Sequence, residues 1–221
     1  MKKAFFVGAM SVAFLTNLSA QEKESNPPVK NPPIIVEGLF GNRGMTYQMI
    51  INKKLQTIPK LGFFSVTNLV AEWEATPMTD VMTQTSLTYT LVKGLDLAAG
   101  FHYTPVTGIR PSAGLIYTYA TPEFLLVANP RIDLKEDAMT EFMVLTEYKP
   151  AINEEWSLYT RLQGLYGFMV DNSDHARSYI VLRAGVTYKD FTFGAGANFD
   201  WYGPTKHYET NIGAFISVPL F

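Results

Sequence analysis

The side chains best suited to chemistry in this sequence are arginines spaced by even numbers of residues in its second half. Arg177, Tyr179 and Arg183 would share one face of an extended strand, because side chains two residues apart point the same way. Tyr159 and Arg161 repeat this spacing in the preceding segment. Guanidinium groups on a common face can bind the anionic part of a polar solute, or they can hold carboxylates in ion pairs.

Carboxylates are expected close to these arginines. Antiparallel pairing of 155–170 with 175–189 places Arg161 next to Arg183. Antiparallel pairing of 138–149 with 155–170 places Glu141 and Glu147 within a few residues of Arg161. Other polar residues expected on the same face are Gln163, Tyr179, Asn198, Asp200, Glu209 and Asn211. We predict that a binding cluster is formed by Arg161, Arg183, Arg177, Glu141, Glu147, Tyr159 and Asp200.

The histidines suggest two alternative chemistries. The side chains of His102 and Ser112 are predicted to point to the same side of the sheet from adjacent strands, as the histidine and serine of a hydrolase would. No acid or asparagine completes a triad in the sequence. His175 and His207 could share a metal with Asp174, although they lie on different hairpins and exposed loop histidines are the simpler interpretation. The chain has no cysteine, which excludes disulfides and cysteine-ligated metals. No catalytic residue, metal or cofactor is predicted.

The elements that must position the cluster are long strands with alternating faces. Within 175–189, the side chains of Ile180, Leu182 and Val186 fall on one face, opposite Arg183. The next segment, DFTFGAGANFDWY, places aromatic residues and alanines on one face and polar residues and glycines on the other. This period of two is typical of a strand with one apolar and one polar environment.

The pattern continues through most of the chain and predicts about twelve strands. We expect them at 34–40, 45–54, 62–74, 80–93, 95–104, 108–120, 123–133, 138–149, 155–170, 175–189, 190–202 and 207–221. Ten strands remain an alternative, with 34–54 forming one long strand or part of the interior. If the strands form a transmembrane β-barrel, both termini normally face the periplasm, which requires an even strand number.

The distribution of aromatic residues favours an all-β, antiparallel transmembrane β-barrel, in which apolar faces meet lipid and polar faces line the lumen. Aromatic residues of apolar parity are expected at the periplasmic strand ends at Tyr119, Phe124, Tyr148, Trp156, Tyr188 and Phe191. Those expected at the outer ends are Tyr103, Phe168, Phe199, Trp201 and Tyr208. A soluble β-sandwich or lipocalin would also alternate but would not need outward-facing aromatics at both ends.

The N-terminal region is predicted to direct export. Residues 1–20 combine two lysines, an apolar stretch and terminal small residues, which is typical of a signal peptide cleaved near Ala20. Residues 21–33 hold four prolines and are expected to form a periplasmic linker before the barrel, 34–221. No later apolar run is long enough for a spanning helix. The formal charge of −2 argues against a nucleic-acid partner.

The C-terminal residues carry one inconsistency. Phe221 shares its parity with Pro219, Ser217 and Phe215, whereas the opposite parity, which includes Leu220, is more uniformly apolar. Either a bulge near Pro219 shifts the register, or the last phenylalanine leaves the barrel wall.

The sequence resembles the porin-like outer-membrane β-barrel proteins of Gram-negative bacteria. The resemblance rests on the N-terminal leader, the strand pattern over 34–221 and the terminal phenylalanine. The stretches 148–154 and 194–198 are also similar to members without assigned function. The resemblance covers the mature chain but brings no catalytic motif. It implies residence in the outer membrane and insertion by the outer-membrane assembly machinery.

Two functional hypotheses follow from the polar face. In one, the barrel is a channel for passive passage of small polar solutes, with arginine and carboxylate walls that select by size and charge. In the other, the same residues form an ion-pair network that fills a closed structural or interaction barrel. An outer-membrane hydrolase that uses His102 is a third alternative. The expected partners are outer-membrane lipid, small polar solutes and other copies of the chain.

Overall fold

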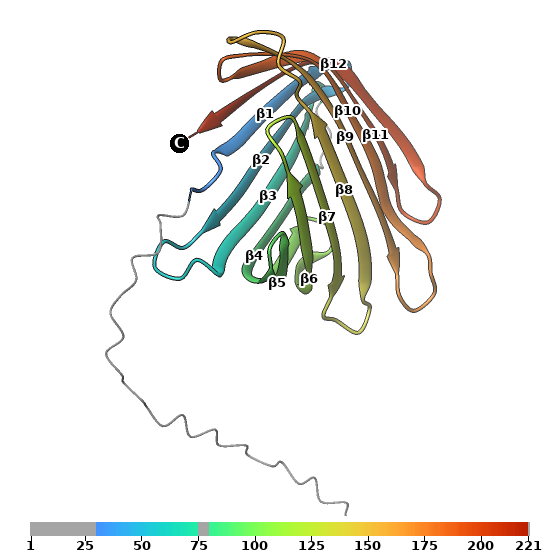
Figure 1. Ribbon diagram of the computed structural model, residues 1–221. Helices are drawn as coiled ribbons and strands as arrows, with labels where there is room; N and C mark the ends of the chain where they lie inside the picture. The colour runs from blue at the N-terminus through green and yellow to red at the C-terminus, as the bar shows by residue number, and fades with distance from the viewer. Residues whose placement is uncertain (1–29, 75–79, 221) are drawn as a thin grey trace, which may run out of the picture.

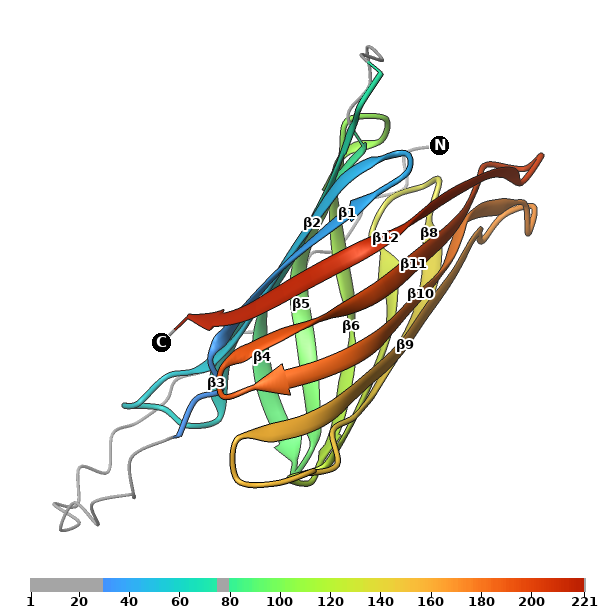
Figure 2. The ribbon, with the colours of Figure 1, turned by 90° about the horizontal axis from the view of Figure 1, so that it is seen from above.

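The computed structural model describes residues 30–74 and 80–220, and it is a closed antiparallel barrel of twelve strands (Figure 1). The strands are β1 (Ile34–Gly41), β2 (Gly44–Lys54), β3 (Leu61–Glu72), β4 (Asp80–Val92), β5 (Leu95–Thr104), β6 (Gly108–Ala120), β7 (Phe124–Asp133), β8 (Met139–Tyr148), β9 (Trp156–Met169), β10 (His175–Tyr188), β11 (Phe191–Tyr202) and β12 (His207–Leu220). Each strand pairs with its neighbours in sequence, and β1 closes the barrel on β12 (Figure 2). The prediction of twelve strands is confirmed, and the ten-strand alternative is wrong.

Two predicted segments lie partly or wholly outside the described residues. These are the leader, 1–20, and most of the proline-rich segment, 21–29. The described end of that segment is held to the barrel because Asn31 Nδ2 donates to the Lys54 carbonyl, and the Lys54 amide donates to Asn31 Oδ1. Among the described residues, no helix has the length and apolar character needed to cross a membrane.

The alternation of side chains decides which face of the sheet is the interior. On β10, Ile180 and Leu182 are 40% and 41% exposed, whereas Tyr179 and Arg183 are buried. The outside of the barrel is therefore apolar, and the interior collects the arginines and their partners. This is the arrangement expected of a transmembrane barrel and the reverse of a soluble one.

Aromatic residues gather at both ends of the barrel. We call the end that carries Ile34 and Leu220 the inner end, and the opposite end the outer end. At the inner end, the rings of Trp156 and Tyr188 lie 4.7 Å apart between centroids. At the outer end, Trp201 and Tyr208 lie 5.4 Å apart. These pairs occupy the places where a lipid–water boundary favours amphipathic rings.

The C-terminal strand resolves part of the predicted inconsistency. The register between β1 and β12 runs without a shift from Gly213 to Leu220, so the predicted bulge near Pro219 is absent. Phe215 is buried inside the barrel, and Leu220 is half exposed on its outside. Phe221 itself lies outside the described residues.

The start of β10 differs from the expectation. The pairing with β9 shifts between His175 and Arg177, which turns the His175 ring toward Tyr166, 5.6 Å away, and out of the lumen-facing series. His175 is buried and not exposed, since its ring nitrogens contact the Gly203 carbonyl and the Ser178 hydroxyl. His207 is exposed, as expected.

Glycines permit close approach of strands where the barrel closes. A Cβ at Gly213 would overlap the main-chain oxygen of Phe40 on β1. A Cβ at Gly164, in the middle of β9, would meet nothing nearer than the Tyr179 oxygen at 3.8 Å.

Gly213→Ala should therefore destabilise the barrel by about 1–3 kcal/mol, the usual cost of overpacking, whereas Gly164→Ala should leave stability nearly unchanged. The measurement is the temperature at which the heat-modifiable folded form is lost on electrophoresis. Equal losses in the two variants would show that strand closure at Gly213 is not a close-packed constraint.

Candidate functional site

The interior is organised around a carboxylate that two arginines share. Glu37 on β1 accepts from Arg161 Nη1 on β9 at 2.9 Å and from Arg183 Nε on β10 at 2.9 Å. All three side chains are at most 5% exposed. Three strands separate β1 from β9 around the wall, so the Arg161–Glu37 pair reaches through the lumen and not along the sheet.

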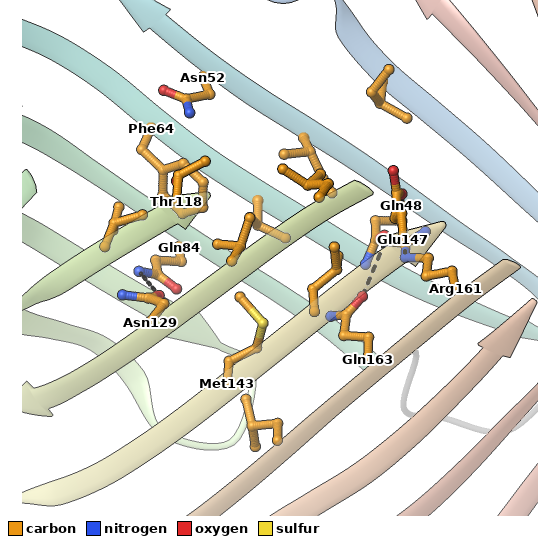
Figure 3. Close-up of a pocket in the computed structure, with 18 of the residues that line it drawn as sticks. Gln48, Asn52, Phe64, Gln84, Thr118, Asn129, Met143, Glu147, Arg161 and Gln163 are labelled. Carbon is orange, nitrogen blue, oxygen red and sulfur yellow. Dashed lines mark hydrogen bonds and ion pairs between the residues drawn. The ribbon is translucent and has the colours of Figure 1, made fainter. Parts of the chain in front are cut away.

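Arg161 extends this network to β2. Its Nη2 donates to Gln48 and, at 3.0 Å, to Gln163. Gln163 in turn donates to the Tyr179 hydroxyl at 2.8 Å. We call Glu37, Gln48, Arg161, Gln163, Tyr179 and Arg183 the central cluster. Figure 3 shows Gln48, Glu147, Arg161 and Gln163 gathered at one side of the space they enclose.

Glu147 lies on the inner side of the central cluster. It accepts from the Tyr159 hydroxyl at 2.9 Å and from Lys149 Nζ at 2.7 Å. Arg161 Nε lies 4.0 Å from Glu147 Oε1 and has no hydrogen-bond partner among the described residues. This Nε atom is buried, and Glu147 is the carboxylate that lies beside it.

A glycine on the wall makes room for the second arginine. Gly196 on β11 is opposite Arg183 in the register, and a Cβ there would lie 2.9 Å from Arg183 Cδ. The absence of a side chain lets the Arg183 guanidinium lie along the wall, where Nη1 donates to Asn198 at 2.8 Å.

A second ion pair spans the lumen nearer the outer end. Arg177 Nη2 on β10 lies 3.0 Å from Asp80 Oδ2 on β4 and 3.0 Å from Asp200 Oδ1 on β11. The Tyr202 hydroxyl also donates to Asp80, at 2.7 Å. Five strands lie between β4 and β10 in either direction, so this contact joins opposite walls. We call Asp80, Arg177, Asp200 and Tyr202 the outer bridge.

A third cluster corrects the predicted position of Glu141. Its carboxylate binds Arg131 on β7, and not Arg161. Arg131 and Arg110 both pair with Asp133, whose side chain is fully buried. Arg110 also donates to Asp137 at 2.9 Å, and this hydrogen bond lowers the pKa of the exposed Asp137 carboxyl in the β7–β8 loop.

Two cavities lie on either side of the central cluster. The inner chamber has a volume of about 280 Å³ and extends from Pro32 and Ala120 at the inner end to Arg161. The outer cavity measures about 60 Å³ and reaches Asp200 and Arg177 of the outer bridge. Both cavities are lined by Gln48, Met82, Gln163 and Tyr179, so these side chains separate them.

The hydrolase alternative gains no support from the geometry. His102 is 2% exposed and pairs in register with Arg110, while Ser112 pairs with Gly100. The Nδ1 atom of His102 has no partner in the described part of the chain, whereas a catalytic histidine needs a group that orients this atom. The described residues contain no cluster of three or more histidine, cysteine or acidic residues suited to a metal.

The structure brings the predicted residues into three groups and not one. Arg161 and Arg183 belong to the central cluster, and Glu147 and Tyr159 lie on its inner side. Arg177 and Asp200 meet at the outer bridge, and Glu141 lies with Arg131. Sequence reasoning missed Glu37, although it is the one charged residue in the apolar segment IIVEGLF and has lumen parity. It also missed Asp80 and Gln48, whose partners come from distant strands.

The fold is that of the outer-membrane porins. The solved structure described as "NanC porin structure in rhombohedral crystal form" has a TM-score of 0.50 and 14% identity, and the alignment covers 85% of this chain and 99% of that one. OprD of Pseudomonas aeruginosa gives a TM-score of 0.42 and 12% identity over 85% of this chain and 63% of its own. No protein-family model matches the chain, and no curated protein matches its sequence.

The central cluster predicts an asymmetric effect of carboxylate removal. Glu37→Ala leaves Arg161 and Arg183 without their shared partner, and breaking a buried ion pair in this way typically costs about 3–5 kcal/mol. Glu155→Ala removes only an exposed pair with Lys189 and should cost about 0–1 kcal/mol.

Denaturant-dependent unfolding in detergent micelles, followed by tryptophan fluorescence, measures both effects. A Glu37→Ala barrel as stable as the Glu155→Ala barrel would show that the two arginines are solvated in the lumen without this carboxylate.

Proposed function

We propose that this protein is a narrow outer-membrane channel for passive passage of small polar solutes. The observation that supports this most directly is the interior itself, in which charged side chains from opposite walls meet at two levels and leave cavities of about 280 and 60 Å³ between and beside them. A constriction of paired charges can select permeants by size and charge.

The proposed roles of the lining residues follow from their charges. Arg161, Arg183 and Arg177 attract the anionic part of a solute, while Glu147 and Asp200 keep the guanidinium groups apart and paired between passages. Tyr159 fixes Glu147 by a hydrogen bond. Glu141 contributes indirectly, because its ion pair holds Arg131 at the wall of the inner chamber.

The proposed location is the outer membrane, with the inner end facing the periplasm. Both described termini lie at the inner end, as in bacterial barrels of even strand number. On this basis residues 1–20 serve as an export signal, residues 21–33 form a periplasmic linker, and the assembly machinery inserts the barrel. Association with outer-membrane lipid and with other copies of the chain is part of the same proposal.

A closed structural barrel is the second candidate, and specific contacts favour it. Gln84 on β4 donates to Asn129 on β7 at 3.1 Å, although two strands separate them. Phe64, Ala98 and Ile116 form an apolar cluster inside the barrel. Side chains that meet in this way can fill a small lumen.

Conductance in a planar bilayer distinguishes the two candidates. The channel proposal predicts discrete current steps from the refolded protein. Asp80→Ala should raise the unit conductance roughly twofold or more, because it removes a carboxylate whose ion pair spans the lumen. The reversal potential should shift in the direction that indicates greater anion selectivity. Arg177 keeps Asp200 as a partner in this variant, so the barrel should remain folded.

Asp190→Ala is the matched control, since this aspartate lies exposed in the turn between β10 and β11 at the inner end. Its conductance should equal that of the unmodified protein. Silence from folded protein in all three cases would reject the channel and favour the closed barrel.

A further inference from the structure

The inner chamber has an apolar wall that an aqueous pore does not need. The lumen of a porin is polar because water and ions fill it. Here apolar side chains from β2, β3, β6 and β7 line the space, namely Ile50, Phe64, Val66, Ile116 and Val127. Such a wall serves either to fill the interior or to contact an apolar ligand.

The chamber is not filled by these side chains. A space of about 280 Å³ remains beside them, which is roughly twice the cavity of ~150 Å³ that holds benzene in a protein core. Ligand pockets of this kind are mainly apolar and carry a few polar groups at defined positions. The chamber is therefore large enough for a ring and a short substituent.

The charges on the chamber wall cancel, which favours an uncharged ligand. The charged side chains that line the chamber sum to zero, and they are Arg131, Arg161, Glu141 and Glu147. Arg131 is paired with Glu141, and Arg161 is paired with Glu37 at 2.9 Å. A charged ligand would be buried here without a free partner, at a high cost in solvation free energy.

One buried amide of the chamber is held in a defined orientation. Asn129 Nδ2 donates to the Leu115 carbonyl at 2.8 Å, so the Asn129 oxygen faces the other way and accepts from Gln84 Nε2 at 3.1 Å. Both amides are therefore oriented by a main-chain carbonyl, which can only accept. The remaining polar atom of this chain of hydrogen bonds is Gln84 Oε1.

Gln84 Oε1 is an acceptor that the barrel does not use. It accepts no hydrogen bond in the part of the chain that the structure describes. The oxygen retains accessible surface although the side chain is only 8% exposed, whereas Arg161 Nε is fully enclosed. Gln84 lines the inner chamber and not the outer cavity, so this oxygen is open to the chamber.

The free acceptor lies beside the apolar wall. Figure 3 shows the hydrogen-bonded Gln84 and Asn129 on the same side of the chamber as Phe64 and Thr118, away from Arg161. Asn129 follows Val127 by two residues on β7, so the two side chains point the same way into the lumen. A ring against this wall could therefore present a donor to Gln84.

The chamber can be reached from the inner end. Ala120 at the end of β6 is exposed and lines the chamber, as do Pro32 and Pro33 before β1. The adjoining Asn31 is held on both sides by the main chain of Lys54, so this part of the rim is fixed. A ligand would enter beside Ala120.

We propose that the inner chamber binds a small uncharged phenol, with its ring against Ile116 and Val127 and its hydroxyl donating to Gln84 Oε1. Burial of the ring supplies most of the binding free energy. The hydroxyl fixes the orientation, because the chamber offers it one unpaired acceptor. This site goes beyond the proposed channel and does not depend on it, since a closed barrel would present the same chamber.

Fluorine NMR with para-fluorophenol tests the site in the full-length protein reconstituted in nanodiscs. The probe is uncharged at neutral pH, because a phenolic hydroxyl titrates near pH ~10. It should show saturable line broadening above the background of empty nanodiscs. Val127→Trp occupies the chamber and should weaken binding roughly tenfold or more, since a close-packed interior cannot yield the lost space. Val70→Trp is the matched control, because Val70 lines only the outer cavity, and it should bind as the unmodified protein does.

Gln84→Leu tests the acceptor, because leucine is of similar size and lacks the oxygen. Para-fluorotoluene has the shape of para-fluorophenol without its donor, so its binding should be unchanged or stronger in this variant. Binding of para-fluorophenol should weaken, and the ratio of the two dissociation constants should change by roughly tenfold, since a hydroxyl buried without a partner loses its hydration. An unchanged ratio in a folded Gln84→Leu barrel would overturn the assignment to Gln84.

Para-fluorobenzoate tests the preference for an uncharged ligand without altering the protein. It keeps the ring but carries a negative charge, and it should bind roughly tenfold more weakly than para-fluorophenol, because the arginines of the wall already have partners. Equal binding of the two probes contradicts the proposal, as does para-fluorophenol binding that survives in a folded Val127→Trp barrel. The heat-modifiable shift on electrophoresis shows that each variant is folded.

Conductance measured on the same preparations keeps this proposal separate from the channel. Saturable binding of para-fluorophenol by a silent barrel would reject the channel and retain the chamber as a ligand site. A conducting barrel that shows no binding of para-fluorophenol above background would reject the ligand site alone.

Discussion

The constraint on which this structure depends is that charged groups inside a narrow barrel must find partners there. Removing an arginine or a carboxylate from water is costly unless an opposite charge and hydrogen bonds replace the lost solvation. Glu37 meets this requirement for Arg161 and Arg183 together. Because the partners come from β1, β9 and β10, satisfying the charges also ties distant parts of the wall to each other.

The same requirement divides the interior into different environments. Polar and charged side chains from β1, β2, β9 and β10 meet at the central cluster, while β2, β3, β6 and β7 contribute apolar residues to the inner chamber. Glycine at position 196 leaves space for Arg183 against the wall. The result is a lumen with a charged side, an apolar side and a small acidic region at the outer bridge, where Arg177 faces Asp80 and Asp200.

Much of the fold was predictable because the two faces of a strand in a barrel wall meet different environments, lipid on one side and the lumen on the other. Ile180 and Leu182 face outward while Arg183 faces the lumen, and the alternation of apolar and polar residues in the sequence predicts this. The register about each hairpin was also predictable, since antiparallel pairing across a short turn fixes which residues are opposite. Arg161 thus lies beside Arg183 and Glu147 beside Arg161. The local exception is His175. A register shift between His175 and Arg177 places its side chain outside the series that faces the lumen.

The sequence by itself determined the inside and outside faces of the strands and the neighbours of most residues along the sheet, because these depend on a period of two and on short turns. It predicted about twelve strands, and the closed barrel decided between twelve and ten. Only the tertiary structure decided which charges meet across the lumen. Glu37 and Arg161 are 124 residues apart in the chain, and Arg177 and Asp80 are 97 apart. Their contact depends on closure of the barrel and on how far its walls approach, and no local pattern encodes that distance. For the same reason the inner chamber could not be predicted from the sequence, since it is enclosed only by the closed barrel of twelve strands.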